Sequence, residues 1–489
     1  MAEVLRVVNL AKRVSENKIL LMSLFFVSAV IFLLVFSWST SPIIEFGGYD
    51  SSIFKTIGLF TAKGLTPYKD FFDHKGPVIV FIEWLGYGLT KSDYTMLLLQ
   101  AIFLTFALYG VFKIAKIFLN TKKSVLLALV TLLVCSLIMS GQGGNIVEEW
   151  ILPLLIWSSY FFVRFFAYKE KEFNFKYSIL YGVTVAFAAF SRLTNAIPAL
   201  IFCLVILIYL IKQKAWKNIL KNILAFVAGA LIITIPIIVW FVVNGALKEM
   251  LYSTFVFNYK YMKARSFVPD IMRILRHAVR YLLPLIFAVV LQVAMIVKKK
   301  DVWLNVALLI QSIVAIVMQV TSALFPHYLY IWVPTIIITF ILAVKDYGVM
   351  KWFVRGYATL LVVVFIGTNF IAFKRYHDFL GDNYKNYVKM CRDVGEHIPD
   401  KSKPMVSIGS NPYIYLVTDT VPCYKYFHTQ DLHATYDPQT KKEWEDLLKS
   451  KKAEYIVANN MGEYPSYKII RKGYKLIYRS KYFAILEKR

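Results

Sequence analysis

Long apolar runs recur through most of this chain, and they constrain its fold more than any other feature. A run of about 18 or more apolar residues is long enough to cross a bilayer as a helix, and 58% of the 489 residues are hydrophobic. The sequence therefore predicts an α-helical polytopic membrane protein. We place about eleven spans, near 19–38, 94–117, 124–141, 150–167, 177–191, 196–211, 219–242, 281–297, 302–320, 328–344 and 356–373.

Lysine clusters predict how these spans are oriented. The first run, Ile19 to Trp38, is too long for a signal peptide and has no small-residue cleavage site, so we expect it to be a retained span. With the N-terminus in the cytoplasm, the basic segments fall on inner loops, as the positive-inside rule expects. These segments are 122–123, 169–176, 212–221, 298–300 and 345–355. Eleven is odd, so the C-terminal tail is expected outside.

The formal net charge of +26 has two explanations. It could indicate nucleic acid, but lysine-rich loops and contact with anionic membrane lipids are the commoner cause in a membrane protein, so we expect no nucleic-acid partner. None of the four cysteines has CxxC spacing, which argues against a zinc or redox motif. A Cys391–Cys423 disulfide is left open.

The sequence divides into a membrane part, 1–375, and a tail, 376–489. The tail alternates helical stretches (383–397 and 441–450) with short strand-like runs (405–408, 455–458, 476–478 and 482–486), which predicts a small extracytoplasmic α/β domain. Residues 39–93 form the first outer loop. Within it, 78–89 is apolar but short and contains Glu83, which favours a helix lying along the outer membrane interface over a span.

The first outer loop concentrates ionisable and aromatic residues beside the first span. Asp50 follows Gly47-Gly48-Tyr49 and precedes a helix-compatible run. It could be a helix cap, or it could act as a general base on an acceptor hydroxyl; position alone does not separate the two. Tyr49, Tyr68, Phe71 and Phe72 offer aromatic faces for a sugar or an isoprenoid.

A second cluster, Asp70, Asp73, His74 and Lys75, precedes Pro77. Asp73 could cap the following helix and Lys75 could be a surface lysine. Alternatively, Lys75 is a compact cation at membrane-surface height, suited to the phosphate of a lipid-linked donor.

Other polar groups are predicted on the same side of the membrane. Asn145 and Glu148 lie at the entry to the fourth span, and Arg192 and Asn195 lie between the fifth and sixth. His327 and Tyr328 lie before the tenth. Arg192 is expected to have a phosphate or carboxylate partner, because a guanidinium close to hydrocarbon requires one. The basic outer segment 245–280 suggests an anionic ligand, with lipid headgroups as the alternative.

Five short motifs follow one another along the chain: GGYDSSIF, PYKDFFDHKGP, GGNIVEEW, SRLTN and FPHY. In this order they resemble those of the bacterial GT-C glycosyltransferases, in the superfamily of protein mannosyltransferases and aminoarabinose transferases. The resemblance covers the membrane part and is strongest in the first hundred residues. It implies inverting transfer of a sugar from a polyprenyl-phosphate carrier, without a nucleotide. It also implies that Asp50 is the base and that Lys75 and Arg192 contact the carrier phosphate. His74 stands where many relatives carry an acidic residue, which leaves the role of a divalent cation open.

These observations predict a glycosyltransferase in the plasma membrane of a prokaryote. Its acceptor would be a cell-surface glycan, teichoic acid or glycolipid, and its other partners membrane lipids. No phosphate-binding glycine loop, HExxH or nucleophile elbow is present. The main alternative is a transporter or flippase of lipid-linked sugars, which would carry ionisable residues in the middle of its spans. A third alternative is a non-catalytic scaffold that presents the tail domain to partners.

Overall fold

The computed structural model describes residues 17–44, 50–139, 143–264, 282–321, 325–346, 351–352, 354–364, 366–367, 370, 385–409, 412–459, 465–480 and 483–489. By its internal contacts the chain divides into two compact units. Unit 1 comprises Met1–Ser37, Leu97–Ile235 and Phe267–Lys374, and unit 2 comprises Trp38–Met96, Pro236–Ser266 and Arg375–Arg489. Unit 2 therefore joins the first outer loop and the tail. The predicted domain boundary at 375/376 stays a prediction.

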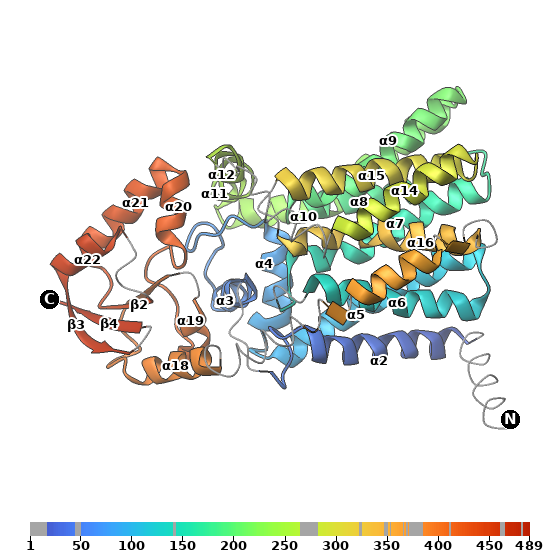
Figure 1. Ribbon diagram of the computed structural model, residues 1–489. Helices are drawn as coiled ribbons and strands as arrows, with labels where there is room; N and C mark the ends of the chain where they lie inside the picture. Colours follow the sequence, from blue (N-terminus) through green and yellow to red (C-terminus); the bar gives the residue numbers. More distant parts are fainter. Residues whose placement is uncertain are drawn as a thin grey trace. The chain divides into compact units, whose positions relative to one another are not determined.

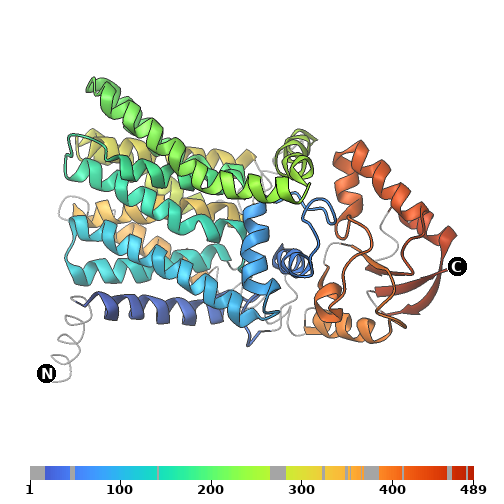
Figure 2. The same ribbon diagram turned by 180° about the vertical axis from the view of Figure 1, so that it is seen from behind.

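Unit 1 is a helical bundle whose helices run side by side in both views (Figures 1 and 2). Its helices are α2 (Lys18–Phe36), α5 (Asp93–Phe118, which begins in unit 2), α6 (Thr121–Met139), α7 (Val147–Ala167), α8 (Phe175–Ala189), η2 (Leu193–Ala196), α9 (Ile197–Lys212), α10 (Trp216–Val243, which ends in unit 2), α14 (Leu283–Val297), α15 (Val302–Thr321), η5 (Pro326–Trp332) and α16 (Val333–Lys345). A further apolar helix covers Val354–Val364.

The predicted polytopic membrane fold is confirmed. Each of the first ten predicted spans overlaps a described helix, and the eleventh overlaps Val354–Val364. In the described part of the chain, seven helices are long and apolar enough to cross a membrane, by length and composition. The shorter ones, α8 and α14, have 15 residues each, or about 22 Å of helix.

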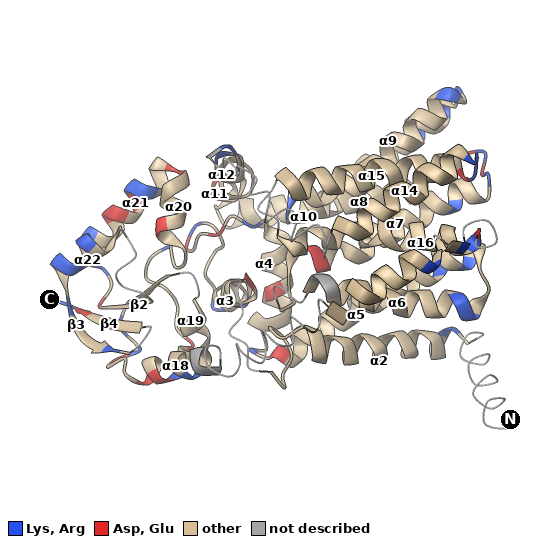
Figure 3. Ribbon diagram, viewed as in Figure 1, with Lys and Arg blue, Asp and Glu red and all other residues tan. Residues whose placement is uncertain are grey.

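Charged residues avoid the middle of the bundle helices. In the described helices of unit 1 they lie within the first or last two turns, and Figure 3 shows lysine and arginine gathered at one end of the bundle. That end holds the start of α2 and the connections α5–α6, α7–α8, α9–α10 and α14–α15. The basic segments predicted to lie on inner loops thus share one end, as the predicted topology requires.

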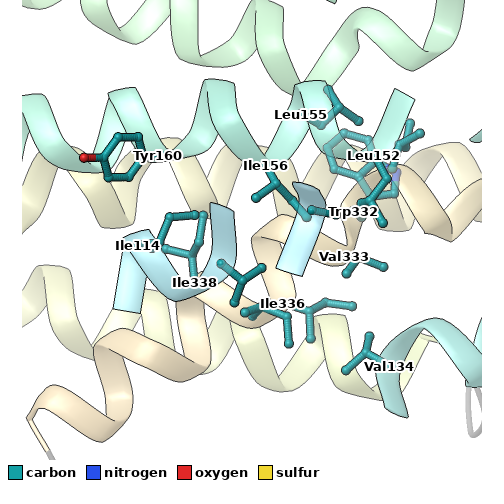
Figure 4. Packing of buried hydrophobic residues seen from close by; sticks show 14 of the residues in the cluster. Ile114, Val134, Leu152, Leu155, Ile156, Tyr160, Trp332, Val333, Ile336 and Ile338 are labelled. Atoms are coloured by element: carbon teal, nitrogen blue, oxygen red, sulfur yellow. The ribbon is translucent and has the colours of Figure 1, made fainter. Parts of the chain in front are cut away.

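The bundle core is a continuous apolar cluster in which α5, α6, α7, η5 and α16 interdigitate (Figure 4). Tyr181, Tyr330 and Trp332 are among its fully buried side chains. A few hydrogen bonds add direction to this packing: Gln292 on α14 donates to Thr339 on α16 at 2.8 Å. Bonds between polar side chains on neighbouring helices stabilise membrane bundles because lipid offers them no alternative partner.

In unit 2, the outer loop forms a compact hairpin of helices. It contains α3 (Asp50–Ala62), α4 (Pro77–Glu83) and the π-helix η1 (Trp84–Gly88). Gly58 and Gly88 let α3 and η1 touch, since a Cβ on Gly88 would lie 2.2 Å from the Gly58 carbonyl oxygen. Together α4 and η1 span 12 residues, or about 18 Å. That length is too short to cross a bilayer, in agreement with the prediction for 78–89.

The tail forms the predicted α/β domain. Its four-stranded sheet has the order β1-β2-β4-β3, with β1 (Met405–Ile408) parallel to β2 (Tyr455–Asn459). The strands β3 (Tyr474–Arg479) and β4 (Phe483–Lys488) are antiparallel to their neighbours. The tail helices are α18 (Lys385–Glu396), α19 (Tyr413–Thr418), α20 (Gln430–Tyr436), α21 (Pro438–Lys449) and α22 (Tyr467–Gly473). Cys391 and Cys423 are not joined by a disulfide.

The tail packs directly on the outer loop within unit 2. Phe60 of α3 meets Phe427 edge to face at 5.0 Å and Tyr415 at 5.2 Å between ring centroids. A third element joins this core: α11 (Leu247–Leu251), the π-helix η3 (Tyr252–Phe257) and α12 (Asn258–Ala264). Phe72 of the loop and Phe257 of η3 belong to the same buried cluster as the sheet. This packing decides which residues surround the outer loop.

Candidate functional site

Asp50 is the first residue of α3 and is half-buried. No described residue forms an ion pair or hydrogen bond with its carboxylate. Tyr49 and the glycine pair before it lie outside the described residues. The carboxylate therefore caps no backbone N–H of α3 among the described residues, although the helix start favours a negative charge at this position. The role of Asp50 as a base stays a prediction.

Three hydrogen bonds hold the segment Asp73–Lys75: one within it, one from the same loop and one from α12. The Lys75 backbone N–H donates to Asp73 Oδ1 at 2.6 Å, and the Tyr68 hydroxyl donates to the Lys75 carbonyl at 2.7 Å. Asn258 of α12 donates to the His74 carbonyl at 2.6 Å. With these groups satisfied, the backbone is fixed where the Lys75 side chain leaves it.

Lys75 is half-buried, and its ammonium is held by a histidine. Its ammonium donates to His74 Nε2 at 3.1 Å, and no described carboxylate pairs with it. Because an ammonium has only donors, His74 Nε2 must accept, and the ring is therefore neutral in this geometry. His74 also stacks on Tyr261, with ring centroids 5.7 Å apart. A rigidly held cation without an ion-pair partner among the described residues is a suitable anion site.

Asp73 does not cap α4, because Gly76 is the N-cap residue and Pro77 opens the helix. Asp73 is instead buried, and its Oδ2 accepts from His428 Nε2 at 3.0 Å. Burial alone would raise the pKa of Asp73, but the His428 hydrogen bond and electrostatic interactions with His74, His428 and Lys75 hold it well below its usual value. The carboxylate is therefore a structural anion here.

The predicted aromatic faces of the loop pack against protein. Tyr68 is buried with its ring 5.6 Å from that of Phe241, and Phe71 and Phe72 are buried in the core of unit 2. The structure gives these three rings a packing role. Asp70 is exposed and accepts from the Thr66 backbone N–H at 2.7 Å.

In unit 1, the predicted outer residues form a second group around Arg192. Its guanidinium donates to Glu148 Oε1 at 2.8 Å, and its Cζ lies 3.6 Å from the centroid of the Tyr328 ring. Glu148 is 2% exposed and Arg192 28%. The predicted partner of Arg192 is therefore a carboxylate, and the part of the guanidinium that stays exposed remains open to a ligand.

Three further predicted residues lie beside this group in the sequence. Asn145 is buried, has a positive φ of 54°, and accepts from Trp150 Nε1 at 3.3 Å. Asn195 is buried in η2, and its Nδ2 has no hydrogen-bond partner among the described residues. His327 is buried against the ring of Tyr328, at 4.4 Å between centroids. Each is an interior residue of unit 1.

The predicted site residues thus fall into two groups, one in each unit. The group in unit 2 consists of Asp50, Tyr68, Asp70, Asp73, His74 and Lys75. The group in unit 1 consists of Asn145, Glu148, Arg192, Asn195, His327 and Tyr328. Two tail residues that the sequence analysis did not predict, His428 and His433, contact the group in unit 2. The run Phe427-His428-Thr429 carries no motif that could have marked it.

The basic outer segment 245–280 is described only up to Ala264. Lys260 pairs with Asp437 at 2.9 Å. Burial raises the pKa of Asp437, but hydrogen bonds from Tyr252 and Lys260 outweigh it and lower the value to about 2. Lys260 is therefore neutralised by the tail. Among the residues that the structure describes, no group of three or more His, Cys, Asp or Glu side chains could hold a metal ion.

One family model matches most of the chain. It describes the N-terminal domain of the competence-induced protein Ccs4, and it covers residues 9–352. Among curated proteins, none matches this sequence.

Solved structures resemble the chain over nearly its whole length. ArnT of Cupriavidus metallidurans, bound to undecaprenyl phosphate, shares 14% identity with a TM-score of 0.56, covering 96% of this chain and 98% of ArnT. In its apo state the TM-score is 0.58, at 14% identity and with coverage of 95% and 97%. The apo oligosaccharyltransferase of Archaeoglobus fulgidus shares 11% identity at a TM-score of 0.50, covering 95% of this chain and 74% of the other. The predicted GT-C fold is confirmed.

Proposed function

The chain belongs to the family of the N-terminal domain of the competence-induced protein Ccs4, and from this premise, together with its GT-C fold, we propose that it is a membrane-embedded inverting glycosyltransferase. It would move a sugar from a polyprenyl-phosphate carrier to a glycan, teichoic acid or glycolipid acceptor. The ArnT structure of this fold is described as bound to undecaprenyl phosphate, which supports a carrier of that class.

One observation carries the proposal: Lys75 projects from a backbone held by three hydrogen bonds, and no described carboxylate forms an ion pair with it. A cation so placed can take an oxygen of the carrier phosphate without reorganising. A departing lipid phosphate needs its charge stabilised rather than a proton, and a preorganised cation supplies that stabilisation.

Asp50 is the proposed general base. The acceptor hydroxyl oxygen attacks the anomeric carbon, the bond from that carbon to the phosphate oxygen breaks, and the configuration inverts. The hydroxyl proton passes to Asp50, and the polyprenyl phosphate leaves with the electron pair. A half-buried carboxylate with no partner among the described residues is suited to this step, which typically contributes 10²- to 10⁴-fold in rate.

Arg192 is proposed as a second donor-phosphate contact. Its pairing with Glu148 and its position over Tyr328 orient the guanidinium while part of it stays exposed. Five further residues remain proposed substrate contacts: Asp70, His74, Asn145, Asn195 and His327. The predicted contact role of Tyr49 lies outside the described residues.

The distribution of charge favours an enzyme over a transporter. A transporter of lipid-linked sugars is expected to place ionisable residues near the middle of its spans, often at broken helices. In the described bundle helices, charged residues lie within the first or last two turns. The lysine-rich end of the bundle supports a cytoplasmic N-terminus and an outer active face in a prokaryotic plasma membrane.

The proposal is tested with purified full-length protein in proteoliposomes that contain a radiolabelled polyprenyl-phosphate sugar. We expect the label to leave the lipid fraction and appear on a glycan or glycolipid acceptor. Lipid extracts of a deletion strain should accumulate the same carrier. Movement of intact lipid-linked sugar across the bilayer, with no cleavage, would instead establish the transporter.

A further inference from the structure

Beyond the residues that the proposed function names, a hydrogen-bonded chain runs from the tail to the outer loop. It begins at Asp73, whose Oδ2 accepts from His428 Nε2 at 3.0 Å; the two side chains are 3% and 2% exposed. The other oxygen of Asp73 accepts from the Lys75 backbone N–H. One carboxylate thus joins a histidine of the tail to the backbone of Lys75.

The chain continues past His428 to a second histidine. Thr429 Oγ1 lies 2.8 Å from His428 Nδ1 and 3.2 Å from His433 Nε2. A carboxylate can only accept, so His428 Nε2 carries a proton. The single proton of the Thr429 hydroxyl can go to only one of the two rings, so that the other ring must donate to its oxygen.

His433 also contacts the outer loop. Its ring packs edge to face against His74 at 5.7 Å and against Phe72 at 5.2 Å between centroids. The ring is buried, and in the described part of the chain its Nδ1 has no hydrogen-bond partner. A tail residue therefore limits where the imidazole of His74 can lie, and His74 in turn accepts from the Lys75 ammonium.

We propose that His428 and His433 are positioning residues of the donor-phosphate site. His428 holds Asp73, which holds the Lys75 backbone, while His433 holds His74, which holds the Lys75 ammonium. The tail thereby sets the place at which Lys75 meets a phosphate oxygen of the lipid carrier. This inference rests on the proposed role of Lys75. Neither histidine touches the substrate.

The test measures binding of undecaprenyl phosphate to the full-length protein in detergent, with uncharged undecaprenol as the control ligand. We expect His428→Phe to weaken phosphate binding by roughly tenfold or more, the scale usual for residues that orient a ligand-binding group, and to leave undecaprenol binding unchanged. His428→Gln, which keeps an N–H donor for Asp73, should restore most of the affinity. His397→Gln changes another tail histidine, which bonds to Asp393, and should bind as the wild type does.

A double-mutant cycle separates positioning from a general loss of structure. If His428 acts through Lys75, His428→Phe has little further effect once Lys75→Gln is in place. Equal losses in both backgrounds would overturn the inference, as would unchanged binding by a folded His428→Phe. Should that variant fail to fold, the cycle is run with His433→Phe. Absence of phosphate binding by the wild type would instead refute the proposed function itself.

Discussion

Asp73 of the outer loop and His428 of the tail lie 355 positions apart in the sequence and share a buried hydrogen bond of 3.0 Å. Removing one partner of such a pair leaves the other charged or polar group without compensation. We expect Asp73→Ala to cost about 3–5 kcal/mol, because both His428 and the Lys75 N–H lose their acceptor.

A fall in the apparent melting temperature of the full-length protein, with faster proteolysis, would show this loss. Asp419 offers a matched control, since it also joins the tail to the loop through Lys63 and Lys91 but is about half exposed. Asp419→Ala should cost no more than about 1 kcal/mol. Equal losses for the two variants would contradict a structural role for the buried pair.

Asp50→Asn should remove transfer while sparing the fold. The amide keeps the size of the side chain but cannot take a proton, so we expect the turnover rate to fall by about 10²- to 10⁴-fold. Donor binding and melting temperature should stay near wild type. Asp419→Asn, at a half-exposed ion pair of the tail, is the control. Full activity in Asp50→Asn would exclude this residue as the base.

Lys75→Gln should weaken binding of a polyprenyl phosphate. A hydrogen bond to a charged group contributes about 1.5–3 kcal/mol, which corresponds to roughly 10- to 100-fold in affinity. The salt dependence of binding should also decrease, because one charge pair is lost. Lys69→Gln alters an exposed lysine of the same loop and should have little effect. If the two variants bind equally, Lys75 is not a phosphate contact.

Acid should loosen unit 2 through His433. Burial lowers the pKa of this imidazole well below 6.5, and electrostatic interactions with His428, His74 and Lys75 lower it further, whereas the interaction with Asp73 raises it. Below about pH 6.5 the unfolded chain takes up a proton that the folded state resists, so stability is complete above this pH and falls as the pH decreases. One such proton changes stability by up to about 1.4 kcal/mol per pH unit.

Melting temperatures between pH 7.5 and 5.0 check this expectation. In His433→Phe the decline should be shallower than in the wild type, because the titrating group is gone. His397→Gln should keep the wild-type slope. A slope that His433→Phe leaves unchanged would assign the acid sensitivity to other groups.

Arg192→Lys should destabilise unit 1, because a lysine loses the planar contact with Tyr328 and part of the fork that meets Glu148. We expect a loss of about 1–2 kcal/mol. Tyr328→Phe keeps the ring and should be near neutral, whereas Tyr328→Leu should resemble Arg192→Lys in stability. If Arg192 also contacts the carrier phosphate, only Arg192→Lys will weaken phosphate binding.

Much of the fold was predictable because it depends on local pattern. Apolar runs located the bundle helices, and short runs such as Met405–Ile408 located the tail strands. The lengths of the apolar runs and the positions of the lysines can both be read directly from the sequence. The roles of the aromatic residues were not predictable, since Phe71 and Phe72 are equally suited to a sugar face and to a protein core until their neighbours are known.

The sequence by itself determined the membrane bundle, the α/β tail and the outer-loop cluster around Asp50 and Lys75. Hydrophobicity and charge are local properties of a segment and do not depend on which distant residues it contacts. Only the tertiary structure decided that Asp73 supports Lys75 instead of capping a helix, and that His428 and His433 stand behind it. Those contacts join residues hundreds of positions apart, and they form only when the tail packs on the loop and burial makes each polar group find a partner.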